Sequence, residues 1–370
     1  MKRMVYLSPV PWDSFTQRPH KFVEWFHEIS EGEVLWVDPY PTRLPSLSDF
    51  SRRPAPGRLG RTESWLECLT VKALPVEPIP VLNVFNRYLR RELVAKINAF
   101  ASLGSTSLVI GKPSALALQL LKEGAFEKSI YDSMDDFPAF YSGLSKYSMQ
   151  CKERAVVRSV DHVLVSSTLL MHRAKDMHPT ADIRLCENAC AVEVLPPVDL
   201  MCRPASRILG YVGTIGKWFD WELIRRLAEC ANVTVRLIGP VYTPAPFTLP
   251  ANVEMLPQCS HAQAIAAMQG FDVGLIPFKI TELTESVDPI KYYEYRALGL
   301  PIITSAFGEM RVHAQQAGVF SLDASDKSSH LLHTVEAALA YRFTLDDLEL
   351  FRQKNSWSAR FSSAALFSGV

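Results

Sequence analysis

Two groups of residues in the second half of the sequence have the types and spacing that bind a diphosphate. In the first, an apolar run at residues 208–212 leads into Gly213-Thr214-Ile215-Gly216-Lys217. Glycines let a backbone approach a phosphate closely, a helix expected to open at Trp218 would offer free N–H groups, and the lysine adds positive charge. The turn therefore predicts a diphosphate cradle, and the alternative is an ordinary strand-to-helix turn with a surface lysine.

The second group lies between Asp288 and Thr304. Pro289 suits the start of a helix and Gly299 suits its end. Lys291 and Glu294 are three residues apart, so they share a face near the start of that helix. A cation for phosphates and a carboxylate for ribose hydroxyls would point together, whereas the alternative is an exposed ion pair that contributes little.

This second stretch, residues 289–301 with the sequence Pro-Ile-Lys-Tyr-Tyr-Glu-Tyr-Arg-Ala-Leu-Gly-Leu-Pro, resembles the strongest signature of the GT-B glycosyltransferases of the group 1, family-4-like type. The resemblance implies that Glu294 binds the donor ribose, that Lys291 binds its phosphates, and that residues 213–217 form the pyrophosphate loop. In such enzymes the segment around 256–258 lies beside the nucleotide base. The donor-binding residues expected on this basis are Gly213, Thr214, Gly216, Lys217, Gln258, Asp288, Pro289, Ile290, Lys291 and Glu294.

The sequence departs from that family at one position near the donor sugar. Many members carry a glutamate eight residues before the ribose-binding one, but this chain has Ser286 there, with Glu285 beside it. The identity of the donor sugar is therefore not predicted.

The first half offers candidate bases for the acceptor hydroxyl. Tyr131-Asp132-Ser133-Met134-Asp135-Asp136 follows an expected strand, and His20 follows the first strand. A carboxylate or imidazole within hydrogen-bond reach of an attacking hydroxyl can accept its proton, although aspartates at strand ends also cap turns and helices. We favour Asp132 or Asp135, with Asp136 and His20 as the other candidates.

The aspartate pattern also resembles bacterial polysaccharide-assembly members of the group, including xanthan-type glucuronosyltransferases, in which an aspartate of the N-terminal domain acts as base. That resemblance implies inversion at the anomeric carbon, whereas the family-4 likeness of the second half implies retention. The stereochemistry stays open.

The elements that must position these residues are short apolar strands alternating with helices, which is typical of parallel sheets covered on both faces. The alternation restarts after Pro196-Pro197, so we predict an N-terminal acceptor domain at 1–203 and a C-terminal nucleotide-sugar domain at 204–370. Each is expected to be a doubly wound α/β, Rossmann-like domain. The GT-B resemblance implies that the two face each other across a cleft, with a final helix at about 344–370 packing back on the first. Strands are expected at 3–7, 34–37, 69–74, 107–110, 129–131, 163–165 and 192–195, then at 208–212, 235–238, 253–256, 273–277, 302–304 and 319–322.

Composition excludes several classes of protein. The chain has 370 residues, more than one core usually supports, and 48% of them are hydrophobic, so it is not a disordered protein. Lysine plus arginine equal aspartate plus glutamate at 39 each, so no net field points to nucleic acid. The first residues hold too few apolar side chains for a signal peptide or membrane span, which predicts a cytoplasmic protein. The cysteines show no metal-like spacing and no Asp-x-Asp triplet follows a strand, so we expect no metal and no cofactor.

One segment of the first half predicts contact with a membrane. Residues 84–96 mix basic and apolar side chains at helical spacing, as in helices that lie on anionic lipid, and this could place the protein at the inner face of the cytoplasmic membrane. The alternative is an amphipathic helix packed on its own sheet.

The resulting hypothesis is a metal-independent glycosyltransferase that moves a sugar from a UDP- or GDP-sugar to a hydroxyl of a glycan or lipid-linked glycan in bacterial polysaccharide biosynthesis. A nucleotide-sugar 2-epimerase of the same fold is the first alternative. A non-catalytic sugar-binding protein is the second, from another class.

Overall fold

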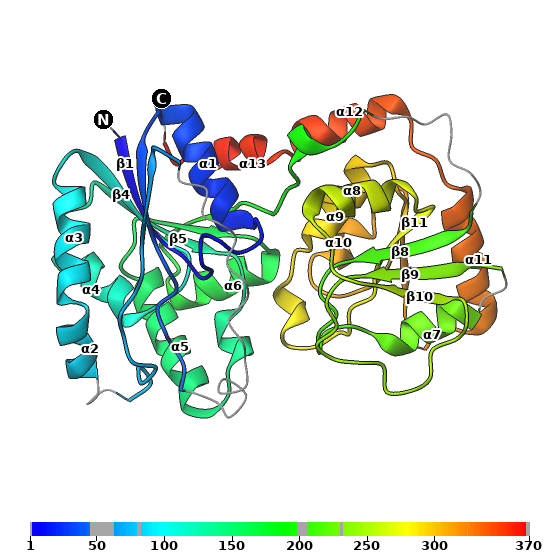
Figure 1. Cartoon of the computed structure of the whole chain (residues 1–370), viewed down its shortest axis with the longest axis horizontal. Helices are drawn as coiled ribbons and strands as arrows, with labels where there is room; N and C mark the ends of the chain where they lie inside the picture. The colour runs from blue at the N-terminus through cyan, green and yellow to red at the C-terminus, as the bar shows by residue number, and fades with distance from the viewer. Residues whose placement is uncertain are drawn as a thin grey trace. The chain divides into compact units, whose positions relative to one another are not determined.

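The computed structural model describes residues 2–44, 63–79, 83–197, 206–229, 232–323 and 325–367. The contacts between residues divide the chain into two compact units (Figure 1). The first contains Met1–Cys186 and Phe361–Val370, and the second contains Glu187–Arg360.

The first unit is built on a seven-stranded parallel sheet with the order β3-β2-β1-β4-β5-β6-β7. The sheet therefore has its topological switch point between β1 and β4, where the order reverses. Its strands are β1 (Lys2–Leu7), β2 (Glu33–Val37), β3 (Leu66–Leu69), β4 (Ser105–Ile110), β5 (Lys128–Ser133), β6 (His162–Val165) and β7 (Asp182–Leu185).

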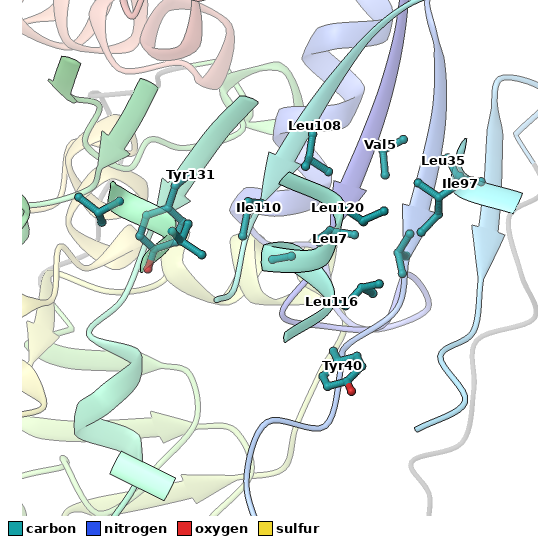
Figure 2. Close-up of a cluster of buried hydrophobic side chains, with 14 of the residues drawn as sticks. Val5, Leu7, Leu35, Tyr40, Ile97, Leu108, Ile110, Leu116, Leu120 and Tyr131 are labelled. Atoms are coloured by element: carbon teal, nitrogen blue, oxygen red, sulfur yellow. The ribbon is translucent and has the colours of Figure 1, made fainter. Parts of the chain in front are cut away.

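Helices cover both faces of this sheet because successive strand residues point to opposite sides. Val5 and Leu7 of β1 pack with Leu116 and Leu120 of α4, and Figure 2 shows these side chains gathered between strands and helices. On the other face, the ring of Tyr6 contacts that of Phe22 in α1. The helices of the unit are α1 (Arg18–Ser30), α2 (Asn83–Leu89), α3 (Arg91–Ala101), α4 (Ala115–Glu123), α5 (Gly143–Val157) and α6 (Thr168–Met177), with the short 3-10 helix η3 (Phe137–Phe140).

The second unit is built on a six-stranded parallel sheet with the order β10-β9-β8-β11-β12-β13. One core packs α8 and α9 on one face, and another packs α7 and α11 on the opposite face. The strands are β8 (Ile208–Val212), β9 (Thr234–Ile238), β10 (Val253–Leu256), β11 (Val273–Ile276), β12 (Ile302–Ser305) and β13 (Val319–Leu322). The helices are α7 (Trp221–Glu229), α8 (His261–Gln269), α9 (Ile290–Ala297), α10 (Met310–His313), α11 (Ser328–Ala340) and α12 (Leu345–Lys354), with the 3-10 helices η4 (Val192–Val194) and η5 (Thr284–Ser286).

These two sheets confirm the predicted fold class, and every strand expected in the second half is present. Three expectations for the first half were wrong. The strand expected at 69–74 lies earlier, at Leu66–Leu69, because the apolar residues after it are in a loop. The apolar stretch at 192–195 forms η4 and not a strand, and the last strand of the first sheet is β7, whose exposed and half-buried residues gave no apolar run. The basic helix expected at 84–96 is broken at Arg90 into α2 and α3.

The segment before the predicted boundary at 203 groups with the second unit, because hydrogen bonds tie it there. The backbone N–H of Cys190 donates to the carbonyl of Asn355 over 3.1 Å. The backbone N–H of Asn188 donates to the carboxylate of Asp288 over 2.6 Å. The chain therefore enters the second unit directly after β7.

The end of the chain returns to the first unit through the second half of α13 (Trp357–Ser363). The ring of Phe361 lies 4.9 Å from that of Phe22 and 5.4 Å from that of Trp25, both in α1. The expected final helix is in fact two helices, α12 and α13, separated near Asn355. None of the helices in the described part of the chain is both long and apolar enough to cross a membrane.

Candidate active site

The start of α9 brings the predicted lysine and glutamate together. Pro289 is the N-cap, and Lys291 and Glu294 follow within the first turns. The ammonium of Lys291 lies 2.7 Å from Oε2 of Glu294. The Glu294 side chain is 8% exposed and that of Lys291 is 25% exposed, so this pair is largely buried and is not the exposed pair of the alternative interpretation.

Glu294 has a second partner that the sequence did not predict. Nε2 of His261, the first residue of α8, lies 3.3 Å from Oε1 of Glu294. Burial opposes ionisation of Glu294, but the charge of Lys291 and the hydrogen bond from His261 outweigh it and lower the pKa of this carboxyl to about 2. Glu294 is therefore a carboxylate at any physiological pH. The Ser260–Gln263 capping box marks the start of α8 in the sequence, but nothing there pairs His261 with Glu294.

The glycine turn after β8 lies against Lys291. Gly213 has a φ of 152°, and a Cβ at this position would stand 3.5 Å from Cε of Lys291. Gly239, at the end of β9, has a φ of 142°, and a Cβ there would stand 2.1 Å from the carbonyl oxygen of Gly213. The two loops thus approach backbone to backbone, which only glycine allows.

The helix expected to open at Trp218 begins instead at Trp221. The carboxylate of Asp220 accepts hydrogen bonds of 3.1 Å from the backbone N–H groups of Glu222 and Leu223, which satisfies the first turn. The start of α7 is therefore occupied, and the expectation that it offers free N–H groups to a phosphate was wrong. Lys217 is exposed in the turn before it, next to Gly216, which is covered by the ring of Trp218.

Asp288 is engaged inside the unit. Its carboxylate accepts from the backbone N–H of Asn188, from the hydroxyl of Tyr293 over 3.0 Å, and lies 3.2 Å from Nε2 of His313. Its side chain is fully buried. Asp288 therefore holds the segment that leads into the second unit and is not exposed as a donor ligand would be. Of the other predicted donor residues, Thr214 and Ile290 are half-buried, Pro289 is buried and Gln258 is exposed three residues before His261.

The position at which the sequence departs from the family signature is buried. Ser286 is buried, 1% exposed, within η5. The neighbouring Glu285 is turned towards Arg311 and pairs with it over 2.5 Å. Glu285 therefore does not take the place of the missing glutamate.

In the first unit, the four candidate bases have different surroundings. Asp132 is fully buried at the end of β5, where Oδ1 lies 2.8 Å from Nη2 of Arg18 and Oδ2 accepts from the hydroxyl of Tyr6 over 3.1 Å. Asp136 is buried and pairs with Arg173. These two carboxylates are therefore paired with arginines.

His20 is also engaged. Its Nδ1 accepts from the backbone N–H of Gln17 over 3.2 Å, and Nε2 donates to the carbonyl of Trp12 over 3.1 Å. Burial lowers its pKa, so the ring is neutral and both nitrogens are used to hold the loop before α1.

Asp135 is the remaining candidate. Its side chain is half-buried, and no hydrogen bond or ion pair to it is found among the described residues. The pKa of this carboxyl is raised to about 7, and burial is the largest cause. The charge of Arg18 opposes the increase, whereas the charges of Asp136 and Asp132 add to it. Such a carboxylate can take a proton near neutral pH.

The chain is similar to proteins that transfer sugars. A protein of Bacillus subtilis (strain 168), named "Putative teichuronic acid biosynthesis glycosyltransferase TuaH", is 23% identical over 330 residues, which cover 81% of this chain and 79% of that protein. No protein-family model matches the chain.

Solved structures resemble it along its whole length. Sucrose-phosphate synthase from Thermosynechococcus elongatus has a TM-score of 0.72 at 14% identity, covering 99% of this chain and 98% of that one. The apo form of the lipopolysaccharide outer core galactosyltransferase WaaB has a TM-score of 0.64 at 13% identity, covering 100% of both.

Asp132 should matter for stability more than for turnover. Because Asp132→Asn removes the carboxylate that neutralises the buried guanidinium of Arg18, we expect it to lower the free energy of unfolding by about 3–5 kcal/mol in urea titrations. The matched control is Asp182→Asn, which removes a carboxylate that is 42% exposed and pairs with Arg184, and it should cost under about 1 kcal/mol. Full stability of Asp132→Asn together with lost turnover would instead restore Asp132 as the base.

The two parallel sheets and the similar structures show the GT-B fold, and the relative in Bacillus subtilis supports the glycosyltransferase activity predicted from the sequence.

Proposed function

We propose that the enzyme transfers a sugar from a nucleoside diphosphate sugar, UDP- or GDP-linked, to a hydroxyl of a glycan or lipid-linked glycan during bacterial polysaccharide assembly. The observation that carries the proposal is the buried Lys291–Glu294 pair at the start of α9, beside the Gly213 turn. The relative's name refers to teichuronic acid biosynthesis, and a similar structure is described as bound with UDP-2-fluoro glucose, which supports a polysaccharide product and a UDP donor.

In this proposal Lys291 neutralises the departing diphosphate and Glu294 accepts hydrogen bonds from the ribose hydroxyls. Lys217 and the N–H groups at the start of α9 add to the positive potential, so no metal is needed to stabilise the leaving group. Gln258, exposed after β10, lies where the family resemblance expects the base.

The reaction also needs a base for the acceptor, and we assign Asp135. As the acceptor oxygen bonds to the anomeric carbon, the bond from that carbon to the diphosphate breaks and its electron pair leaves with the phosphate. The acceptor proton passes to the Asp135 carboxylate. This single displacement inverts the anomeric centre.

Titration calorimetry with UDP, GDP, ADP and dTDP, each with magnesium and with EDTA, tests the donor site. We expect one of them to bind equally well under both conditions and binding to weaken at least about tenfold in Glu294→Ala and Lys291→Ala, because each loses a charge-assisted contact. The control is Glu336→Ala, which breaks the Arg207 pair elsewhere in the unit and should bind normally. Failure of all four nucleotides to bind would refute the proposal, and binding only with magnesium would refute its metal-independence.

The pKa of about 7 sets the pH dependence expected for Asp135 as base. Only the ionised carboxylate accepts a proton, so kcat/KM should be about half-maximal near pH 7 and fall about tenfold per pH unit below it. Asp135→Asn should reduce kcat by about 100-fold or more with little change in nucleotide affinity, whereas Asp136→Asn should show its main effect on stability. Retention of the anomeric configuration, read by proton NMR of the product, would exclude Asp135 from this role.

An anionic membrane surface is the second partner that we propose, through α2. Four of its large apolar side chains are exposed, namely Val84 at 71%, Phe85 at 65%, Tyr88 at 62% and Leu89 at 42%. The guanidinium of Arg91 lies 4.3 Å from the centre of the Tyr88 ring, and Arg87 is exposed beside it. Apolar side chains flanked by arginines match the interface of a membrane that carries anionic lipid, where a lipid-linked acceptor would be found.

Vesicle co-sedimentation tests this contact. The protein should bind vesicles containing phosphatidylglycerol more strongly than pure phosphatidylcholine, and Phe85→Ser with Tyr88→Ser should weaken binding about 30-fold, at roughly 1 kcal/mol for each partly inserted ring. The control is Leu103→Ser, which removes an apolar side chain that is 70% exposed outside α2. Equal binding of the control and the double variant would remove α2 as the docking element.

A further inference from the structure

His261 ties the start of α8 to the donor carboxylate. It is the first residue of α8, and the reciprocal hydrogen bonds of Ser260 and Gln263 fix the backbone at that point. Its side chain is 53% exposed, yet Nε2 lies 3.3 Å from Oε1 of Glu294. An exposed histidine therefore reaches a carboxylate that is only 8% exposed.

The two oxygens of Glu294 are divided between two partners. Oε2 faces the ammonium of Lys291 over 2.7 Å, and Oε1 faces the imidazole of His261. A buried carboxylate with one partner removed is destabilised strongly, because its charge is left without compensation. The orientation of Glu294 consequently depends on both neighbours.

In the proposed function, Lys291 interacts with two anionic groups, the Glu294 carboxylate and the diphosphate, whereas His261 contacts Glu294. Its side chain runs past Gly213, the turn at which the proposed function places the diphosphate. When the ammonium turns towards a phosphate, its interaction with Oε2 of Glu294 weakens. Oε1 then keeps its partner only if His261 stays in place, and the hydrogen bond from His261 holds the carboxylate for the ribose.

We infer that His261 is a positioning residue of the donor site: it holds Glu294 in the orientation that accepts the ribose hydroxyls while Lys291 engages the diphosphate. This inference rests on the proposed function, since it assigns His261 to the same nucleotide site. Neither the glycine turn nor the helix signature in the sequence includes this residue.

The first test measures the affinity of the nucleoside diphosphate that the wild type binds. His261→Ala should weaken it about tenfold, as expected for loss of a hydrogen bond to a charged group. His261→Gln places an amide N–H donor at a similar reach and should restore affinity to within about threefold of the wild type. His330→Ala is the matched control, because His330 is 54% exposed in the same unit and lies 3.8 Å from Asp326, away from Glu294.

The second test shows whether His261 acts through Glu294. In the Glu294→Ala background, His261→Ala should cause no further loss of affinity, because the group that it positions is gone. The 2′-deoxy form of the same nucleotide should lose less affinity than the ribonucleotide in His261→Ala, since the effect is exerted on a ribose contact.

The outcomes separate the inference from the proposed function. Normal binding by His261→Ala, or an equal and additive loss in both backgrounds, would overturn the role of His261 while the donor site stands. Absence of nucleotide binding by the wild type would overturn both. A loss in His261→Ala that His261→Gln repairs and Glu294→Ala abolishes supports the positioning role.

Discussion

The burial of a charged carboxylate at Glu294 is the constraint on which the arrangement of α8, α9 and the loop after β8 depends. With a side chain 8% exposed, the group remains ionised only because an ammonium stands 2.7 Å from one oxygen and an imidazole 3.3 Å from the other. Helices α8 and α9 and the loop after β8 must therefore hold fixed positions around it. The loop after β8 also approaches the end of β9 closely, since a Cβ at Gly239 would stand 2.1 Å from the carbonyl oxygen of Gly213.

In the first unit, two nearby aspartates differ in whether an arginine compensates their charge. Asp132 and Asp135 are three residues apart, yet one is fully buried against Arg18 and the other is half-buried with no ion pair to any residue that the structure describes. The paired carboxylate stabilises the fold, and the unpaired one acquires a pKa of about 7. Two aspartates at one strand end thus have different charge environments, because Arg18 pairs with Asp132.

Much of the fold was predictable because its strands are buried on both faces and read as continuous apolar runs. β7 was missed because it is an edge strand with few buried residues, and 192–195 was mistaken for a strand because a short apolar stretch does not reveal its hydrogen-bond partners. The pairing of Lys291 with Glu294 followed from helical spacing. The partners of Asp132, Asp288 and Glu294 did not, because Arg18, Asn188 and His261 lie far from them in the sequence and meet them only after folding.

Asp288 shows that the residues at the start of α9 also attach the incoming chain to the second unit. Its carboxylate accepts a hydrogen bond from the backbone of Asn188, where the chain has just entered the second unit, and Glu294 lies six residues later, within α9. His313 and Tyr293 complete the surroundings of Asp288, and the His313 ring stacks on Tyr292 at 3.8 Å. The segment that enters the unit and the buried Glu294 carboxylate are therefore held by neighbouring positions of the same stretch. Residues 288–294 thus meet two physical requirements, the compensation of a buried charge and the attachment of the chain that leads into the unit.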